Sequence, residues 1–125
     1  KEIPVNDNQT IESGEVVVLA TGKASIGAAG AASGTVLGVS NTSITTTTAT
    51  EDDIIKYDVN PHSLYRFNYT GSATPAIGTK YALGTNPYEF NADSTTDGFI
   101  QVVEKVDTDA KTAVVLICNR VFTGV

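Results

Sequence analysis

The sequence predicts an all-β protein, built as a small antiparallel β-barrel or β-sandwich with an extended N-terminal arm and a long C-terminal hairpin. Three observations support this prediction. Segments rich in β-branched and aromatic residues are bounded by Gly, Pro, Asn and Asp. Apolar residues do not recur at helical spacing for more than a turn or two. Turn signals recur about every 8–12 residues, which is typical of small barrels and sandwiches.

The beginning of the chain predicts an arm (residues 1–12) followed by a single β domain (residues 13–125). Pro4 lacks a backbone donor, which confines its segment to a sheet edge or to free extension. Ile3 and Val5 are the only large apolar side chains of the first ten residues. We therefore expect this segment to order on another surface.

Local runs of β-branched and aromatic residues predict the strands of the domain. A turn at Ser13-Gly14 precedes the first confident strand, and Gly38 indicates a bulge or a close approach inside the strand that contains it. We expect strands at residues 15–20, 24–26, 35–40, 54–59, 64–69, 77–83, 88–90, 99–106 and 112–122.

Two segments carry only small side chains. Residues 27–34 are almost entirely Gly and Ala, which predicts either a surface loop or a surface that a neighbouring backbone can approach closely. The Thr-rich run at residues 45–48 has no large apolar face, so an edge strand or an exposed loop is expected. The candidate subunit contacts are Ala28, Ala29, Ala31, Ala32, Thr45, Thr46 and Thr47.

The last two strands form the strongest local signal. Residues 99–106 and 112–122 are joined by 107–111, a length that suits a hairpin. Residues 113–117 are apolar at consecutive positions, so both faces of this strand should be covered. A second sheet, a closed barrel or a partner subunit could provide that cover.

The net charge of −6 bears on the partner class. An acidic chain repels phosphate backbones, so nucleic-acid binding loses its main source of affinity, and the sign is also wrong for anionic membranes. No apolar run approaches the ~20 residues of a membrane span. We expect neither nucleic acid nor a membrane as a partner.

The sequence contains few candidate catalytic residues. The single histidine, His62, lies in an Asn-Pro-His-Ser turn without the local features of a nucleophile or a Cys–His pair. Cys118 lies at the end of an apolar run and is expected to act as a small buried hydrophobe. The acidic run at residues 51–53 is contiguous, so adjacent members point apart and are expected to be solvated. These observations predict a non-enzymatic protein with no catalytic residues.

Metal and cofactor sites are not predicted either. Zinc would need several Cys or His ligands, and phosphate binding would need a Gly-rich loop that opens a helix. Two acidic loops offer hard oxygens for calcium but lack EF-hand spacing, and Asp and Asn are also typical turn residues. The turn role is favoured for Asn91, Asp93, Asp97, Asp107 and Asp109.

Three short segments, spread over most of the length of the chain, resemble the small head decoration (capsid cement) proteins of tailed bacteriophages. They are residues 13–19 (SGEVVVL), 34–39 (GTVLGV) and 98–103 (GFIQVV), within an acidic chain rich in Gly, Ala and Thr. The resemblance implies a β-barrel domain, commonly a homotrimer, seated on the exterior of the virion. The resemblance also implies that the protein is made in the host bacterial cytoplasm and that its partner is the major capsid protein.

In such proteins an N-terminal arm often adds a strand to a capsid protein, which depends on backbone hydrogen bonds. Carried over, the resemblance assigns this role to Ile3, Pro4, Val5 and Asn6. The alternative is a receptor- or carbohydrate-binding domain of a phage fibre or a bacterial surface protein. That alternative predicts exposed tyrosines around a groove.

Overall fold

The structure is a computed structural model that describes residues 1–121. It contains twelve strands, and no helix occurs within the described residues. The all-β prediction is therefore confirmed. The strands are β1 (Glu2–Pro4), β2 (Thr10–Ile11), β3 (Val16–Ala20), β4 (Lys23–Ile26), β5 (Val36–Ser40), β6 (Ile44–Thr45), β7 (Ile54–Asp58), β8 (Tyr65–Thr70), β9 (Lys80–Leu83), β10 (Glu89–Asn91), β11 (Ile100–Asp107) and β12 (Thr112–Ile117).

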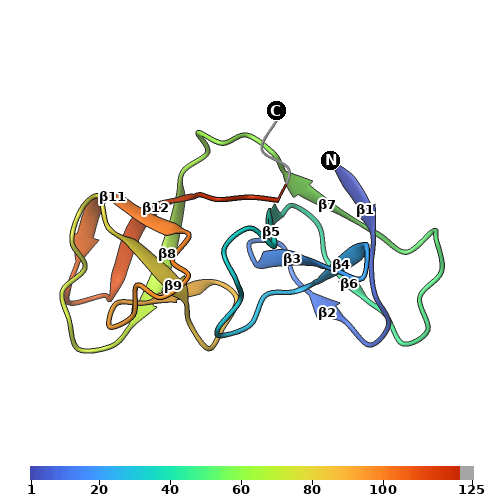
Figure 1. The fold of residues 1–125 in the computed structure, drawn as a ribbon, viewed down its shortest axis with the longest axis horizontal. Coiled ribbons are helices and arrows are strands. Elements are labelled where there is room, and N and C mark those ends of the chain that lie inside the picture. Colours follow the sequence, from blue (N-terminus) through green and yellow to red (C-terminus); the bar gives the residue numbers. More distant parts are fainter. Residues whose placement is uncertain (122–125) are drawn as a thin grey trace.

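Two lobes lie side by side in Figure 1. The N-terminal lobe is a sheet of order β1-β7-β5-β3-β4 with a small β2-β6 ribbon beside it, and the C-terminal lobe is a closed barrel of order β10-β8-β12-β11-β9. All ladders are antiparallel except that between β8 and β10, which is parallel. This one parallel pair closes the barrel.

The shared wall between the lobes consists of β3 and β5. In β3 Val16 belongs to the barrel core and Val17 to the core of the N-terminal lobe, since successive side chains point to opposite faces. In β5 Val36 and Leu37 divide in the same way. Both faces of these strands are covered, so β3 is a continuous apolar run and every residue of β5 is buried.

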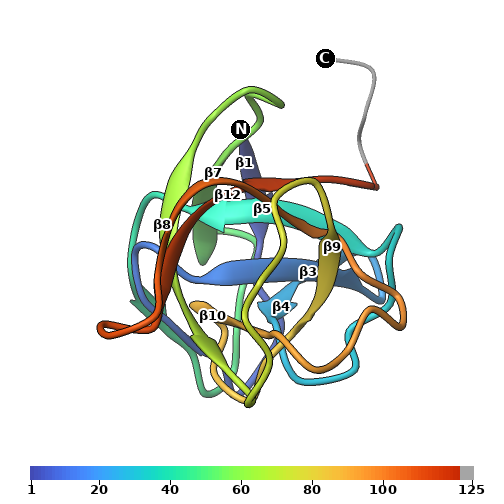
Figure 2. The same cartoon turned by 90° about the vertical axis from the view of Figure 1, so that its left-hand side faces the viewer.

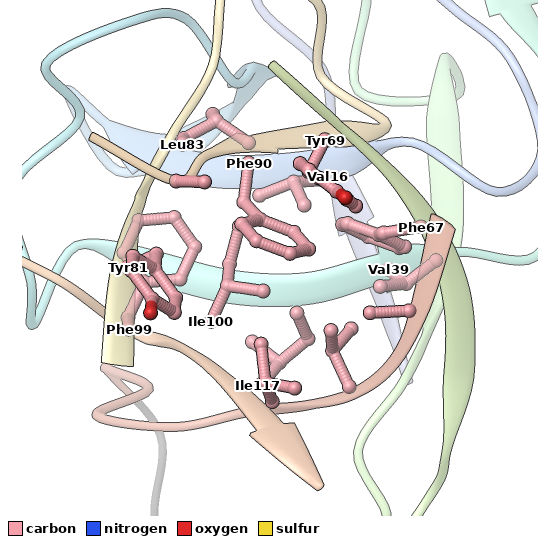
Figure 3. Close-up of a cluster of buried hydrophobic side chains, with 14 of the residues drawn as sticks. Val16, Val39, Phe67, Tyr69, Tyr81, Leu83, Phe90, Phe99, Ile100 and Ile117 are labelled. Carbon is pink, nitrogen blue, oxygen red and sulfur yellow. The ribbon is translucent and has the colours of Figure 1, made fainter. Parts of the chain in front are cut away.

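Side chains fill the barrel interior, so it is a core and not a channel. Phe90 is fully buried, and its ring stacks on Tyr69 and Tyr81 with centroid distances of 5.5 and 5.4 Å. Figure 3 shows these rings together with Val16 and Val39 from the shared wall. The view from the barrel side in Figure 2 shows β3 and β5 crossing behind the barrel strands.

The predicted strands are confirmed, with shifts at their ends. The strand expected at 77–83 begins only at Lys80, since residues 76–79 form a turn. The last strand, expected at 112–122, ends at Ile117, and its predicted end at 122 lies outside the described residues. Beyond Ile117 the chain crosses to the N-terminal lobe, where Val36 and Arg120 form an isolated bridge.

The N-terminal segment differs from the expected free arm. β1 pairs with β7 of its own chain, Val5 is fully buried, and the amides of Val5 and Asn6 donate to Asp53 O and Ala24 O. Residues 1–12 thus belong to the N-terminal lobe and not to a separate arm. Val5 supplies the apolar contact that makes ordering favourable within the chain.

Pro4 occupies the outer edge of this sheet, as its missing donor predicted. Lys1 exchanges hydrogen bonds with Tyr57, so the odd-numbered residues face β7 and the nitrogen of Pro4 faces outward. Val5 also bridges Ala24 of β4, which brings the two ends of the sheet together. The lobe therefore approaches closure, with Pro4 blunting the edge.

Gly38 confirms the predicted close approach. A Cβ at this position would lie 2.6 Å from Asp58 O and 3.0 Å from Nη1 of Arg120. The ladder between β3 and β5 shifts register here, between Val17 and Val18. The missing side chain makes room for the Arg120 guanidinium at the junction of the lobes.

Candidate functional site

The junction of the lobes holds a cluster of polar side chains that are linked by hydrogen bonds. Two segments cross it, residues 59–64 between β7 and β8 and residues 118–121 after β12, and both run along the upper side of Figure 1. Arg120 is 6% exposed, and its guanidinium donates to Asp58 O (2.6 Å), Asn60 O (3.4 Å) and Ile117 O (3.3 Å). The arginine therefore ties the two crossing segments together.

Asp58 and Tyr65 form the second part of this junction cluster. The Tyr65 hydroxyl donates to Oδ2 of Asp58 at 2.6 Å, and the Asn60 amide donates to Oδ1 at 2.8 Å. Burial by itself raises the pKa of Asp58, but hydrogen bonds from Ser63, Tyr65 and Asn60, with the charge of Arg120, outweigh it and lower this pKa. Burial and the bond to Asp58 raise the pKa of Tyr65 to about 12.

These contacts fix the relative positions of the two crossing segments. Each guanidinium nitrogen of Arg120 donates to a backbone carbonyl, and the Asp58 carboxylate accepts hydrogen bonds from Tyr65 and Asn60. His62 is adjacent in sequence but exposed, and its amide donates to Oδ1 of Asn60 within the turn. The expected turn role of His62 therefore agrees with its position.

Sequence reasoning missed Arg120, which it placed inside a long final strand. A signal was present, because an arginine that follows the apolar run 113–117 must either return to solvent or find buried acceptors. Which acceptors it finds depends on a contact with residues about sixty positions away. That distance explains why the local pattern did not reveal it.

The acidic side chains of the two loops accept hydrogen bonds from backbone amides, Asp107 within its own turn as predicted and Asp93 from a different loop. The Asp93 carboxylate accepts hydrogen bonds from the amides of Ser72 and Ala73, which lower its pKa, and the Asp107 carboxylate accepts from Asp109 and Ala110. No group of three or more His, Cys, Asp or Glu side chains with metal-binding geometry occurs among residues 1–121.

An open depression of about 470 Å³ lies at the β2-β6 ribbon. Its lining combines four hydroxyl side chains with one carboxylate and two isoleucines, and it contains no aromatic ring. The lining residues, all within the described part of the chain, are Thr10, Ile11, Glu12, Ser13, Ser43, Ile44 and Thr45.

The tyrosines do not form an exposed platform. Tyr57, Tyr69 and Tyr81 are at most 5% exposed, Tyr65 is half-buried, and Tyr88 is exposed at 42%. Because all five tyrosines fall within the described residues, the groove expected of a carbohydrate-binding domain is not assembled from them.

The predicted contact residues occupy different environments. Ala28, Ala29 and Ala32 are exposed, as are Thr45 and Thr47. Ala31 is half-buried against the barrel core, and Thr46 is buried, where its hydroxyl donates to Asn6 O and accepts from the Gln9 amide. In this chain Thr46 therefore binds the N-terminal segment. Cys118 is half-buried, with its thiol 3.6 Å from Oε1 of Gln101.

The predicted arm residues are held by their own chain. Asn6 donates through Nδ2 to Ala20 O and to the Ser25 hydroxyl, both at 2.9 Å. Ile3 packs against the core of the N-terminal lobe, and Pro4 is half-buried at the sheet edge. The structure brings these four residues together, but on β7 and β4.

Among residues 1–121, no helix has the length and apolar character to cross a membrane. No known protein-family model matches the chain, and no curated protein matches it at a significant level.

Proposed function

We propose that this protein is a non-enzymatic structural protein that binds the outer surface of a phage capsid and stabilises the shell. The observation that carries the proposal is the set of exposed small side chains on a β scaffold, which are Ala28, Ala29 and Ala32 in one segment and Thr45 and Thr47 in the other. Small side chains let the backbone of a neighbouring protein approach closely, and a scaffold closed by backbone hydrogen bonds loses little entropy on docking.

The proposed action is thermodynamic linkage. A subunit that binds only the assembled, expanded shell stabilises that state by mass action, without making or breaking a bond. The resemblance to decoration proteins adds the major capsid protein as the partner, a homotrimer as the assembled form, and the virion exterior as the location. The net charge of −6 keeps the chain from competing for nucleic acid during assembly.

In this proposal the N-terminal segment does not have the capsid-binding role that the resemblance implies for it. Donating β1 to a capsid strand would break its ladder with β7 and expose Val5, which is now fully buried. Contact through side chains that stay exposed, with β1 left in place, avoids this cost. We therefore assign capsid binding to the Ala- and Thr-rich segments.

Co-sedimentation with expanded and unexpanded capsids of the phage whose genome encodes the chain tests the proposal. We expect pelleting with expanded shells only, at a copy number that is a simple fraction of the capsid subunits, and a higher melting temperature of the decorated shell. Absence of pelleting with both shells, or a melting shift of the protein caused by a glycan instead, would contradict it.

A matched pair of variants localises the contact. Ala32→Glu adds a charge to the exposed small-residue loop, and Thr108→Glu adds the same charge to the exposed tip of the final hairpin. We expect about tenfold or greater loss of shell affinity for Ala32→Glu and no change for Thr108→Glu. Equal affinity of the two variants would place the contact elsewhere.

A further inference from the structure

The open depression at the β2-β6 ribbon lies on the face of the ribbon that points away from the lobe core. The register pairs Thr10 with Thr45 and Ile11 with Ile44, and Ile11 is buried in the core of the N-terminal lobe. Because successive side chains of a strand point to opposite faces, Thr10 and Thr45 point outward. Glu12, two residues after Thr10, falls on the same face and is also exposed. The depression is therefore an outward-facing group of hydroxyls around one carboxylate.

The chemistry of this lining favours a cation. All five polar side chains of the lining have an oxygen that can accept a hydrogen bond, and the only formal charge, on Glu12, is negative. The Glu12 carboxylate makes no hydrogen bond or ion pair to another residue within 1–121. Glu15 adds a second negative charge nearby, since its Oε1 accepts from the Glu12 amide at 2.7 Å. Lysine and arginine side chains carry donors and no acceptor, so a basic side chain matches this lining.

The outer edge of β6 indicates how such a side chain is presented. The Thr46 amide donates to Gln9 O, so the backbone groups of Thr45, one residue earlier, point away from β2. No residue within 1–121 bonds to the N–H or C=O of Thr45, whereas the edge of β4 is bonded to the N-terminal segment through Ala24. An extended backbone alongside β6 satisfies both groups of Thr45 and directs every second side chain to the outward face of the ribbon.

We propose that the ribbon binds an extended segment of the partner protein, which pairs with Thr45 at the edge of β6 and places a lysine or arginine side chain in the depression beside Glu12. This inference deepens the proposed function and rests on it, because Thr45 is one of the residues assigned to capsid contact. The partner segment is an exposed, extended part of the capsid protein. Backbone hydrogen bonds position the segment, and the charge-assisted bond to Glu12 selects its basic side chain.

Co-sedimentation of variants with expanded shells tests the charge. Glu12→Gln keeps the size of the side chain and removes its charge, so we expect about tenfold weaker binding. Glu104→Gln, at an exposed position on β11 of the barrel, removes the same charge and should bind like the wild type. The shell affinity of the wild type should also fall more steeply with salt than that of Glu12→Gln.

A pair of substitutions at Thr45 tests the backbone pairing. Thr45→Pro removes the outward N–H without removing a bond of the ladder with β2, whereas Thr45→Val keeps the backbone and removes only the hydroxyl. We expect about tenfold or greater loss of shell affinity for Thr45→Pro and little change for Thr45→Val. Shell binding should also slow hydrogen exchange of the Thr45 amide in the wild type about tenfold or more, which checks the pairing without any substitution.

The outcomes separate this inference from the proposed function. If the wild type pellets with expanded shells but Glu12→Gln or Thr45→Pro binds equally well, or shell binding leaves exchange of the Thr45 amide unchanged, the inference is overturned and the proposed function stands. Equal losses for Thr45→Pro and Thr45→Val, or for Glu12→Gln and Glu104→Gln, also overturn it, because they indicate a side-chain contact or a general charge effect. Absence of wild-type pelleting with both shells contradicts the proposed function and this inference together.

Discussion

The two lobes contain the same number of strands in their main sheets but end those sheets in different ways. In the barrel every strand hydrogen-bonds to a neighbour on both sides, and aromatic rings fill the interior. In the N-terminal lobe the sheet remains open, and the bridge between Val5 and Ala24 joins its ends while Pro4 blunts the outer edge. The barrel thus has no free edge because its backbone ladder closes, whereas the N-terminal lobe protects its edges with a few particular side chains.

This difference predicts where each lobe is most sensitive to mutation. The barrel should depend on the volume of its central rings, because its closure needs no single contact. The N-terminal lobe should depend on the residue that joins its ends. The junction cluster contributes to both lobes, so a substitution there should affect both of them.

The largest effect is expected for Phe90→Ala in the barrel. The ring is fully buried and stacks on Tyr69 and Tyr81, so truncation removes two ring contacts and leaves a cavity. We expect the free energy of unfolding to fall by about 3–5 kcal/mol in urea titrations. Tyr88→Ala in the adjacent turn, at a 42% exposed position, is the control and should cost little. A small loss for Phe90→Ala would mean that the barrel core can collapse around the cavity.

A smaller effect is expected for Val5→Ala in the N-terminal lobe. Val5 is fully buried, and its loss removes apolar volume where the sheet ends meet, so the free energy of unfolding should fall by about 2 kcal/mol. Hydrogen exchange should accelerate at the Val5 amide, which donates to Asp53 O, but not in β12. Pro4→Ala is the control, because the Pro4 nitrogen faces outward. Unchanged stability of Val5→Ala would restore the interpretation of a detachable arm.

These two positions also mark what the sequence could reveal. The alternation of aromatic and polar residues at 64–69 predicted a strand with one buried face, and Phe67 and Tyr69 are buried as expected. The apolar residues of β3 and β5 predicted strands, but so short a run does not indicate which lobe covers each face. Strand identity is local, whereas the division of side chains between two cores is set by contacts far apart in sequence.

The N-terminal segment and Arg120 show the same limit at the candidate sites. Pro4 correctly predicted an edge, yet nothing in the first six residues reveals that β7 and β4 offer a place for Val5. Arg120 falls inside the predicted last strand, and its acceptors at Asp58 and Asn60 become visible only when the lobes are assembled. The apolar run at residues 113–117 predicted that both faces of this strand are covered, but it left three kinds of cover open, and the closed barrel covers the face of Ala113, Val115 and Ile117.

An effect similar in size to that of Val5→Ala is expected for Arg120→Met at the junction. Methionine keeps much of the apolar stem but removes the donors of the buried bond to Ile117 O and of the partly buried bond to Asp58 O. We expect a loss of about 1–3 kcal/mol in the free energy of unfolding. Hydrogen exchange of backbone amides in both lobes is the measurement that shows whether each lobe is affected. Destabilisation confined to one lobe would contradict a clamp that joins them.

The smallest effect compares two tyrosine hydroxyls, one in each lobe. The Tyr57 hydroxyl is buried without a hydrogen-bond partner among residues 1–121, and desolvation raises its pKa, whereas the Tyr81 hydroxyl accepts from the Ala76 amide at 2.8 Å. Tyr57→Phe removes an unsatisfied polar group, so it should leave the free energy of unfolding unchanged or raise it by up to about 1 kcal/mol. Tyr81→Phe removes a satisfied one and should lower the free energy of unfolding by about 1 kcal/mol.

Urea unfolding of the two variants measures this difference in sign directly. Opposite signs would mean that the barrel satisfies its buried polar groups while the N-terminal lobe accepts an unpaired hydroxyl beside the Arg120 clamp. If Tyr57→Phe instead destabilises the protein as much as Tyr81→Phe does, the hydroxyl has a partner in solution. The N-terminal lobe would then be as completely satisfied as the barrel, and its dependence on Val5 would reflect packing alone.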